Sequence, residues 1–270
     1  MSMDTLTERA GKPAARTPMT PARRLILAVG VPVLVALIGW TGLSVVAEVG
    51  TGTYQFSRAL PVTNGTLTAN LGDADVTLVP VPGNSARLTG TITYSLIRPD
   101  VTIQDSSVSY HCAVPAGQCS LNSTLSVPRT ADVNLSSGTG DLTVNGGLSG
   151  KITLSTSTGD LTANGLADSP ATLRTVAGDI TASGISASDV TVSSVTGDVT
   201  LTFTDVPSNV TVRSTTGDIT IILPSGPSKY RIVPSDGVGD VSDSAVPQDP
   251  TSPHVITVSS TTGDISITTS

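Results

Sequence analysis

The chain has 270 residues, of which 38% are hydrophobic and 3% aromatic, and its formal net charge is −7. The charge is uneven: residues 1–24 carry five Lys or Arg and two acidic residues, a net +3, whereas residues 48–270 carry nine Lys or Arg and nineteen acidic residues, a net −10. Because nucleic-acid phosphates need a basic surface, this balance excludes nucleic acid as the expected partner.

The chain begins with a polar tail followed by an apolar segment. Residues 1–24 are rich in Pro, Ala, Thr and Arg without an apolar period, so we expect a disordered tail. Residues 25–47 are 23 residues without a charge. As a helix they would span about 34 Å, enough to cross a bilayer. Because Arg23 and Arg24 precede this segment, the positive-inside rule predicts a single-pass cell-membrane protein with a cytoplasmic N-terminus and an extracytoplasmic remainder.

Two alternatives compete with a retained anchor. Val45 and Ala47 are small residues in cleavage-like spacing, which is the pattern of a removed signal peptide. The uncharged run is longer than the apolar region of about 7–15 residues that signal peptides usually have. A buried helix of a cytosolic protein is the second alternative, but nothing else in the sequence offers a partner to bury it.

The segment after the anchor leads into β structure. Residues 48–66 are predicted to form a short stalk. Residues 67–130 alternate apolar and polar residues outside the strict repeat found later, and Gly72-Asp73 marks a divergent opening unit. Because terminal units of a repeat array must cover the end of its core, we expect this region to form a cap.

Cys112 and Cys119 are the only two cysteines. They flank V-P-A-G between two alternating runs, so they would face each other across a hairpin on the oxidising side of the membrane. A disulfide is therefore predicted, and it would stabilise the fold by roughly 2–3 kcal/mol on the chain-entropy model. A metal or redox pair with His111 is the alternative, but the spacing is not C-x-x-C.

Residues 131–270 repeat one phrase, in which two alternating apolar residues precede a small-residue turn containing Gly-Asp and two more follow it. One copy reads V-T-V-S-S-V-T-G-D-V-T-L from Val190. Successive copies are 19 to 24 residues apart. The glycine of the phrase occurs at Gly140, Gly159, Gly178, Gly197, Gly217, Gly239 and Gly263.

This phrase predicts two strands and two turns per copy. Period-2 alternation turns one face of each strand inward, and the Gly of T-G-D takes a positive φ without steric cost. The second turn is predicted at Asn145-Gly146, Asn164-Gly165 and Ser183-Gly184. One copy buries too little surface to stand alone, so copies should stack about 4.8 Å apart. The predicted fold class is an all-β, elongated β-solenoid-like stack preceded by one transmembrane helix, with each copy either a solenoid coil or a hairpin of a meander.

The sixth copy, around Gly239-Asp240, is degraded and rich in proline. Pro234 stands where an inward strand residue is expected, and proline cannot donate to a strand ladder. We therefore expect this copy to bulge outward as a loop. The closing copy, Ile256 to Ile267, should then rejoin the stack.

An aspartate follows the glycine in every copy. In a stack, these carboxylates would repeat every ~4.8 Å and repel one another by about 1 kcal/mol per pair in water. One interpretation is that each carboxylate accepts amide hydrogen bonds from its own turn. The alternative is a row of Ca²⁺ ions, although the spacing of calcium-binding nonapeptide coils is absent. The column comprises Asp141, Asp160, Asp179, Asp198, Asp218 and Asp264, with Asp240 in the degraded copy.

A column of threonines is predicted on the outward face of the second strands. The simplest interpretation is a solvated strand face. A flat threonine ladder is also suited to bind a glycan or another ordered surface. The column comprises Thr143, Thr162, Thr181, Thr200 and Thr220.

No catalytic or cofactor-binding residue is predicted. His111 and His254 are the only histidines, and neither lies near a Ser or carboxylate in a nucleophile pattern. G-x-S-x-G, H-E-x-x-H and the P-loop are absent from the sequence.

The opening L-G-D-A-D-V-T-L and the recurring T-G-D-[ILV]-T units resemble the bacterial "putative adhesin" or toast-rack β-strand-repeat domains, from Leu67 to Ile267. The resemblance implies an elongated stack of short strands at the cell envelope. The adhesin label transfers as a class and brings no catalytic residue.

The leading hypothesis is a non-enzymatic, membrane-anchored scaffold that binds a cell-surface glycan or protein. One alternative is an envelope-stress sensing or signalling accessory, in which residues 1–24 report inside the cell. Another is a carbohydrate-active enzyme on a β-helix, which the low aromatic content disfavours. An open edge of the stack could also pair with a second copy of the chain.

Overall fold

The computed structural model describes residues 51–95, 100–104, 107–111, 119–167, 169–234 and 239–270. The predicted tail, the apolar segment with its flanking Arg23 and Arg24, and Cys112 of the cysteine pair lie outside these residues. The anchor, the topology and the disulfide therefore stay predictions. Within the described ranges, no helix is long and apolar enough to cross a membrane.

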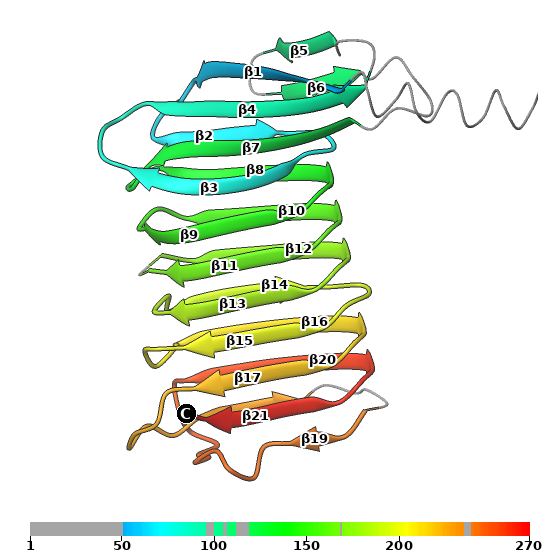
Figure 1. Cartoon of the computed structure of the whole chain (residues 1–270). Helices are drawn as coiled ribbons and strands as arrows, with labels where there is room; N and C mark the ends of the chain where they lie inside the picture. Colours follow the sequence, from blue (N-terminus) through cyan, green and yellow to red (C-terminus); the bar gives the residue numbers. More distant parts are fainter. Residues whose placement is uncertain (1–50, 96–99, 105–106, 112–118, 168, 235–238) are drawn as a thin grey trace, which may run out of the picture. The chain divides into compact units, whose positions relative to one another are not determined.

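The repeat array winds as a solenoid with two sheets (Figure 1). Each regular copy gives its first strand to a 10-stranded sheet, here sheet B, and its second strand to an 11-stranded sheet, here sheet A. The first strands are β8 (Asp132–Thr139), β10 (Ile152–Thr158), β12 (Ala171–Ala177), β14 (Asp189–Ser193), β16 (Asn209–Thr216) and β20 (Val255–Thr262). The second strands are β9 (Leu142–Leu148), β11 (Leu161–Leu166), β13 (Ile180–Ile185), β15 (Val199–Phe203), β17 (Ile219–Leu223) and β21 (Ile265–Thr269). Because strands of successive copies pair in parallel, each copy is a coil and not a hairpin of a meander.

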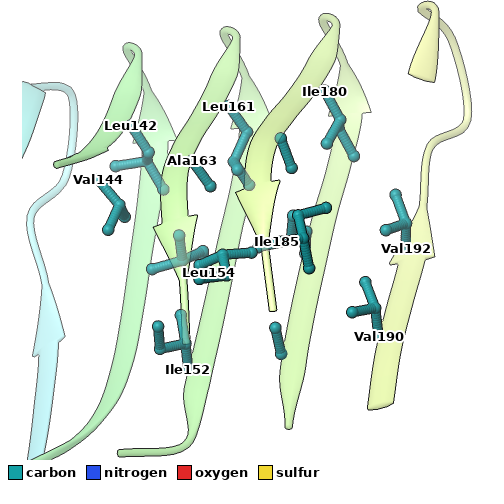
Figure 2. Packing of buried hydrophobic residues seen from close by; sticks show 14 of the residues in the cluster. Leu142, Val144, Ile152, Leu154, Leu161, Ala163, Ile180, Ile185, Val190 and Val192 are labelled. Atoms are coloured by element: carbon teal, nitrogen blue, oxygen red, sulfur yellow. The ribbon is translucent and has the colours of Figure 1, made fainter. Parts of the chain in front are cut away.

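Neighbouring coils pair without offset, so equivalent residues stack. Ile152 pairs with both Val133 and Ala171, and Leu161 pairs with both Leu142 and Ile180. All six side chains are at most 2% exposed. Figure 2 shows four of them, Leu142, Ile152, Leu161 and Ile180, pointing into the space between the two sheets. All are buried aliphatic groups. Burying one of the larger side chains, Val, Leu or Ile, stabilises the folded state by about 1.5–3 kcal/mol. The predicted thin aliphatic core is confirmed.

The predicted second turns are β-bulges and not turns. Asn145-Gly146, Asn164-Gly165 and Ser183-Gly184 lie inside β9, β11 and β13, where the pairing register shifts. The glycines adopt positive φ, for example 69° at Gly165. A left-handed residue inside a strand makes a bulge that re-aims the following side chain. The strand therefore continues inward to a buried Leu or Ile before the chain turns.

The N-terminal end is capped by strands that leave the coil pattern. The opening coil is β2 (Thr66–Asn70) and β3 (Asp75–Val81). Sheet A is extended beyond β3 by β7 (Cys119–Pro128), β4 (Ala86–Ser95) and β1 (Thr51–Leu60), with β4 antiparallel to both neighbours. Sheet B ends with β6 (Ser107–His111) and β5 (Asp100–Gln104). The predicted stalk is corrected here, because residues 51–60 pair along their whole length with β4.

The C-terminal end places the coils out of sequence order. The closing coil, β20 and β21, pairs directly with the fifth coil, β16 and β17. The degraded sixth copy forms β18 (Arg231–Pro234) and β19 (Val241–Ser242), which pair with the far side of the closing coil. The closing coil thus rejoins the stack as predicted, and it lies between the fifth and sixth copies. Pro234 stands on the edge strand β18, where its missing amide is tolerated.

A loop of the sixth copy holds this end in place. Tyr230 is 1% exposed and joins the core. Its backbone N–H donates to Pro247 O at 2.9 Å, and its C=O accepts from Asp249 N at 3.0 Å. Burial raises the pKa of the Tyr230 phenol. The His254 ring lies against the Tyr230 ring, and its Nδ1 is 2.9 Å from Pro207 O. This histidine is therefore part of the packing at the C-terminal end.

Candidate binding surface

The T-G-D corners need glycine for two reasons. Gly140, Gly159, Gly178, Gly197, Gly217 and Gly263 all have φ between 127° and 140°. A Cβ at any of them would also collide with the backbone carbonyl of the preceding corner. The opening corner is Ala74-Asp75 and not the predicted Gly72-Asp73, because Gly140 packs against Ala74 and Asp141 bonds to Asp75.

The corner aspartates form a continuous ladder of hydrogen bonds between coils. From Asp141 onward, each backbone amide in the column donates to Oδ1 of the aspartate in the neighbouring coil, at 2.8–3.1 Å. The sequence prediction of bonds within the same turn is therefore wrong. Stacking brings the next corner's amide within reach of each carboxylate. The order along the ladder is Asp75, Asp141, Asp160, Asp179, Asp198, Asp218, Asp264 and Asp240.

The hydrogen bonds of this ladder offset the repulsion between its stacked carboxylates. A hydrogen bond to a charged group stabilises by about 1.5–3 kcal/mol, which exceeds the repulsion of about 1 kcal/mol between neighbouring exposed carboxylates. All eight side chains of the ladder are exposed. Among the described residues, no group of three or more His, Cys, Asp or Glu is arranged to hold a metal ion. The calcium column stays a prediction.

A second column, of buried hydroxyls, lies just inside the corners. Thr156 Oγ1 donates to Gly140 O (3.2 Å), Thr175 Oγ1 to Gly159 O (3.3 Å) and Ser260 Oγ to Gly217 O (3.1 Å). The hydroxyls of Ser194 and Ser214 occupy the same position but have no partner among the described residues. This column was not predicted from the sequence. The sequence does carry a signal for it, since a Ser or Thr stands three residues before each of the six corner glycines.

The predicted threonine column is part of a longer row on the outer face of sheet A, which we name the hydroxyl row. Strand pairing joins one Ser or Thr from each of the eleven strands, and none of them is buried. From the N-terminal cap onward the row is Ser57, Thr89, Thr124, Thr77, Thr143, Thr162, Thr181, Thr200, Thr220, Ser266 and Ser242. The sequence predicted only the middle five. The strands of the N-terminal cap lack the T-G-D marker, Ser242 lies in the degraded copy, and Ser266 follows a T-G-D corner but is not a threonine.

At the N-terminal cap this face is hollowed into a groove of about 610 Å³, here the cap groove. Its first wall is the beginning of the hydroxyl row, from Ser57 to Thr77. Its second wall is the neighbouring row Gln55, Thr91, Asn122 and Asp75, which pair in register across β1, β4, β7 and β3.

Two small residues lie beneath the cap groove. Gly90 and Ser123 face the core at its centre, and both are buried. The Phe56 ring occupies the space where a side chain on Gly90 would stand. No sequence pattern indicated this groove, since it depends on pairing between strands far apart in the chain.

The chain matches one protein-family model and is similar to solved structures. The family model described as Toastrack DUF4097 matches residues 50–268. A crystal structure of a "putative adhesin" from Bacteroides fragilis is 14% identical with a TM-score of 0.46, and the match covers 80% of this chain and 97% of that one. A "putative cell adhesion protein" from Clostridium sporogenes is also 14% identical, with a TM-score of 0.33 and coverage of 81% and 100%. A comparison with curated proteins found no match. The chain belongs to the Toastrack DUF4097 family.

Proposed function

We propose that this protein is a non-enzymatic, single-pass membrane protein whose solenoid binds ligands outside the cytoplasm. The observation that carries the proposal is the unbroken hydroxyl row, which presents one outward Ser or Thr on every strand of sheet A. A flat, rigid face with regularly spaced polar groups is suited to hold an extended or repetitive ligand, because little order is lost on binding.

Family membership and the sequence support the remaining parts of the proposal. The two solved structures reported above carry the names "putative adhesin" and "putative cell adhesion protein". The uncharged run of residues 25–47 after Arg23 and Arg24 supports an anchor with the solenoid outside. The outer face of sheet A carries the hydroxyl row and the corners carry the exposed aspartate ladder, so both surfaces offer polar groups to a ligand. We infer a role in surface binding.

The topology is tested on intact cells that express the full chain with a C-terminal epitope tag. External protease should remove the tag without permeabilisation, while a cytoplasmic marker protein survives. A tag that is cleaved only after permeabilisation would contradict the proposal.

The binding role is tested with the same cells. Bacteria that display the full chain should adhere to whole cells or cell-wall preparations more strongly than bacteria that display a chain with Thr124, Thr77, Thr143 and Thr162 replaced by Lys, four neighbours of the row that lie partly in the cap groove and partly beyond it. These exposed or half-exposed positions tolerate a long polar side chain, and the added charges disrupt the neutral row. Equal adhesion by both strains, or none by either, would overturn the proposed role of this face.

A further inference from the structure

The cap groove differs from the rest of the hydroxyl row in the chemistry of its second wall. Gln55 and Asn122 supply carboxamides, Asp75 supplies a carboxylate, and Thr91 adds a hydroxyl. A carboxamide both donates and accepts hydrogen bonds, a carboxylate only accepts, and a hydroxyl does both. Such a set matches a ligand whose own groups are densely packed hydroxyls.

We propose that the cap groove is a binding site for a neutral oligosaccharide. The proposal rests on the binding function proposed above and assigns it a place and a ligand class. Two walls of four residues each, about 14 Å long at about 4.8 Å per strand, can contact a short oligosaccharide along its length.

The charge of the groove favours a neutral sugar over a phosphorylated or sulfated one. Its lining contains Asp75 and no Lys or Arg. Arg87 lies one row farther along β4, and its Nη1 already donates to Ser57 Oγ at 3.0 Å. An anionic ligand would approach a carboxylate without a compensating cation in the lining, which is unfavourable.

The polar groups of the second wall are available and fixed in place. The side chains of Gln55, Thr91 and Asn122 make no hydrogen bond within the residues that the structure describes, and Gln55 and Asn122 are exposed. Asp75 Oδ1 accepts from Asp141 N at 3.0 Å, which orients the carboxylate and leaves Oδ2 for a ligand. Because all four residues stand on paired strands and not on loops, little order is lost when a ligand binds.

The backbone of the groove floor argues against a peptide strand. Peptides that extend a sheet bind through unpaired N–H and C=O groups of an edge strand. The floor strands β4, β7 and β3 each have a neighbour on both sides, so their ladder groups are already used. Only β1 is an edge strand. The groove therefore presents side chains, and not unpaired backbone groups, to a ligand.

The test uses the full-length chain in lipid nanodiscs on an array of neutral, sulfated and sialylated oligosaccharides, followed by calorimetric titration of the neutral hits. We expect neutral oligosaccharides built from glucose, mannose, galactose or N-acetylglucosamine to bind. Replacing Gln55 and Asn122 together by Ala should weaken binding at least about tenfold, since each substitution removes a donor and an acceptor. Asn145→Ala is the matched control, because Asn145 is an exposed asparagine on the same face outside the groove.

The two proposals fail in different ways. If cells displaying the chain adhere to cell walls but no neutral oligosaccharide binds, the groove assignment is overturned and the binding scaffold stands. Binding of anionic sugars alone, or of a peptide competed away from the groove, overturns the groove assignment too. Neutral binding that survives the Gln55 and Asn122 substitutions, with unchanged melting temperature in all variants, places the site elsewhere and also overturns it.

Discussion

The middle coils and the two ends of the solenoid share one strand geometry but differ in what each residue meets. In the middle, Asp179 lies between Asp160 and Asp198, and every such residue contacts copies of itself. At the ends, β4 lies antiparallel between β1 and β7, and β18 pairs only with β20. Repetition is required only where a residue must stack on its equivalent. The ends are free of that requirement, and the cap groove lies there.

The largest expected effect concerns the out-of-order closing coil. Deleting residues 255–270 should lose two coils, because β18 and β19 pair only with β20 and β21. The deletion also removes four buried aliphatic side chains, each worth about 1.5–3 kcal/mol. Hydrogen exchange should show that amides of β18 and β19 lose protection together with those of β16 and β17. The affected side chains are Ile256, Val258, Ile265 and Ile267.

A matched variant removes the sixth copy and keeps the closing coil. Residues 224–254 would be replaced by the five residues 204–208, which connect β15 to β16 in an ordinary coil. This variant should fold and keep β16, β17, β20 and β21 protected, although it deletes more residues than the truncation does. If it unfolds more than the truncation, the sixth copy and not the closing coil holds this end.

A smaller effect is expected at a single corner glycine. Gly178→Ala places a side chain against the Gly159 carbonyl and forces Ala into a φ of 140°. We expect a loss of at least about 3 kcal/mol in the free energy of unfolding, from backbone strain and a collision that rigid coils cannot relieve. Denaturant titration measures the loss.

Gly83→Ala in the N-terminal cap is the control for strain alone. Gly83 has a φ of 116°, but nothing lies within 4 Å of the added Cβ. This variant should lose only about 1–2 kcal/mol, the cost of a left-handed alanine. Equal losses at Gly178 and Gly83 would show that the close approach of coils does not contribute.

The aspartate ladder should respond according to position. Asp179→Ala removes the acceptor for Asp198 N and should cost about 1.5–3 kcal/mol, whereas Asp179→Asn keeps an acceptor and removes a repelling charge. Asp240 ends the ladder, and its carboxylate accepts no hydrogen bond within the described residues, so Asp240→Ala should cost less than about 0.5 kcal/mol. Thermal unfolding of the three variants checks this order, and equal losses for the two Ala variants would contradict it.

The same contrast explains what could be predicted from the sequence. The stack, its inward Val190 and Val192, and the positive φ at the corners follow from short-range patterns that recur in every coil. The sequence predicts a turn at Asn164-Gly165, where the structure has a bulge, because a left-handed glycine serves both. The aspartate bonds between coils and the cap groove depend on pairing between distant residues, such as Asp75 with Asn122 and Asp141. No local pattern encodes such a pairing.

The smallest expected effects come from the buried hydroxyl column, and they differ in sign. Thr175→Val keeps the shape of the side chain but removes its bond to Gly159 O, so the protein should lose about 1 kcal/mol. Ser194→Ala removes a hydroxyl that is 3% exposed and has no partner in the described part of the chain. Because a buried unpaired hydroxyl is unfavourable by about 1–3 kcal/mol, this variant should be neutral or more stable. Denaturant titration measures the free energy of unfolding of both variants. If Ser194→Ala lowers it as much as Thr175→Val does, the two hydroxyls are equally hydrogen-bonded in solution and the prediction is wrong.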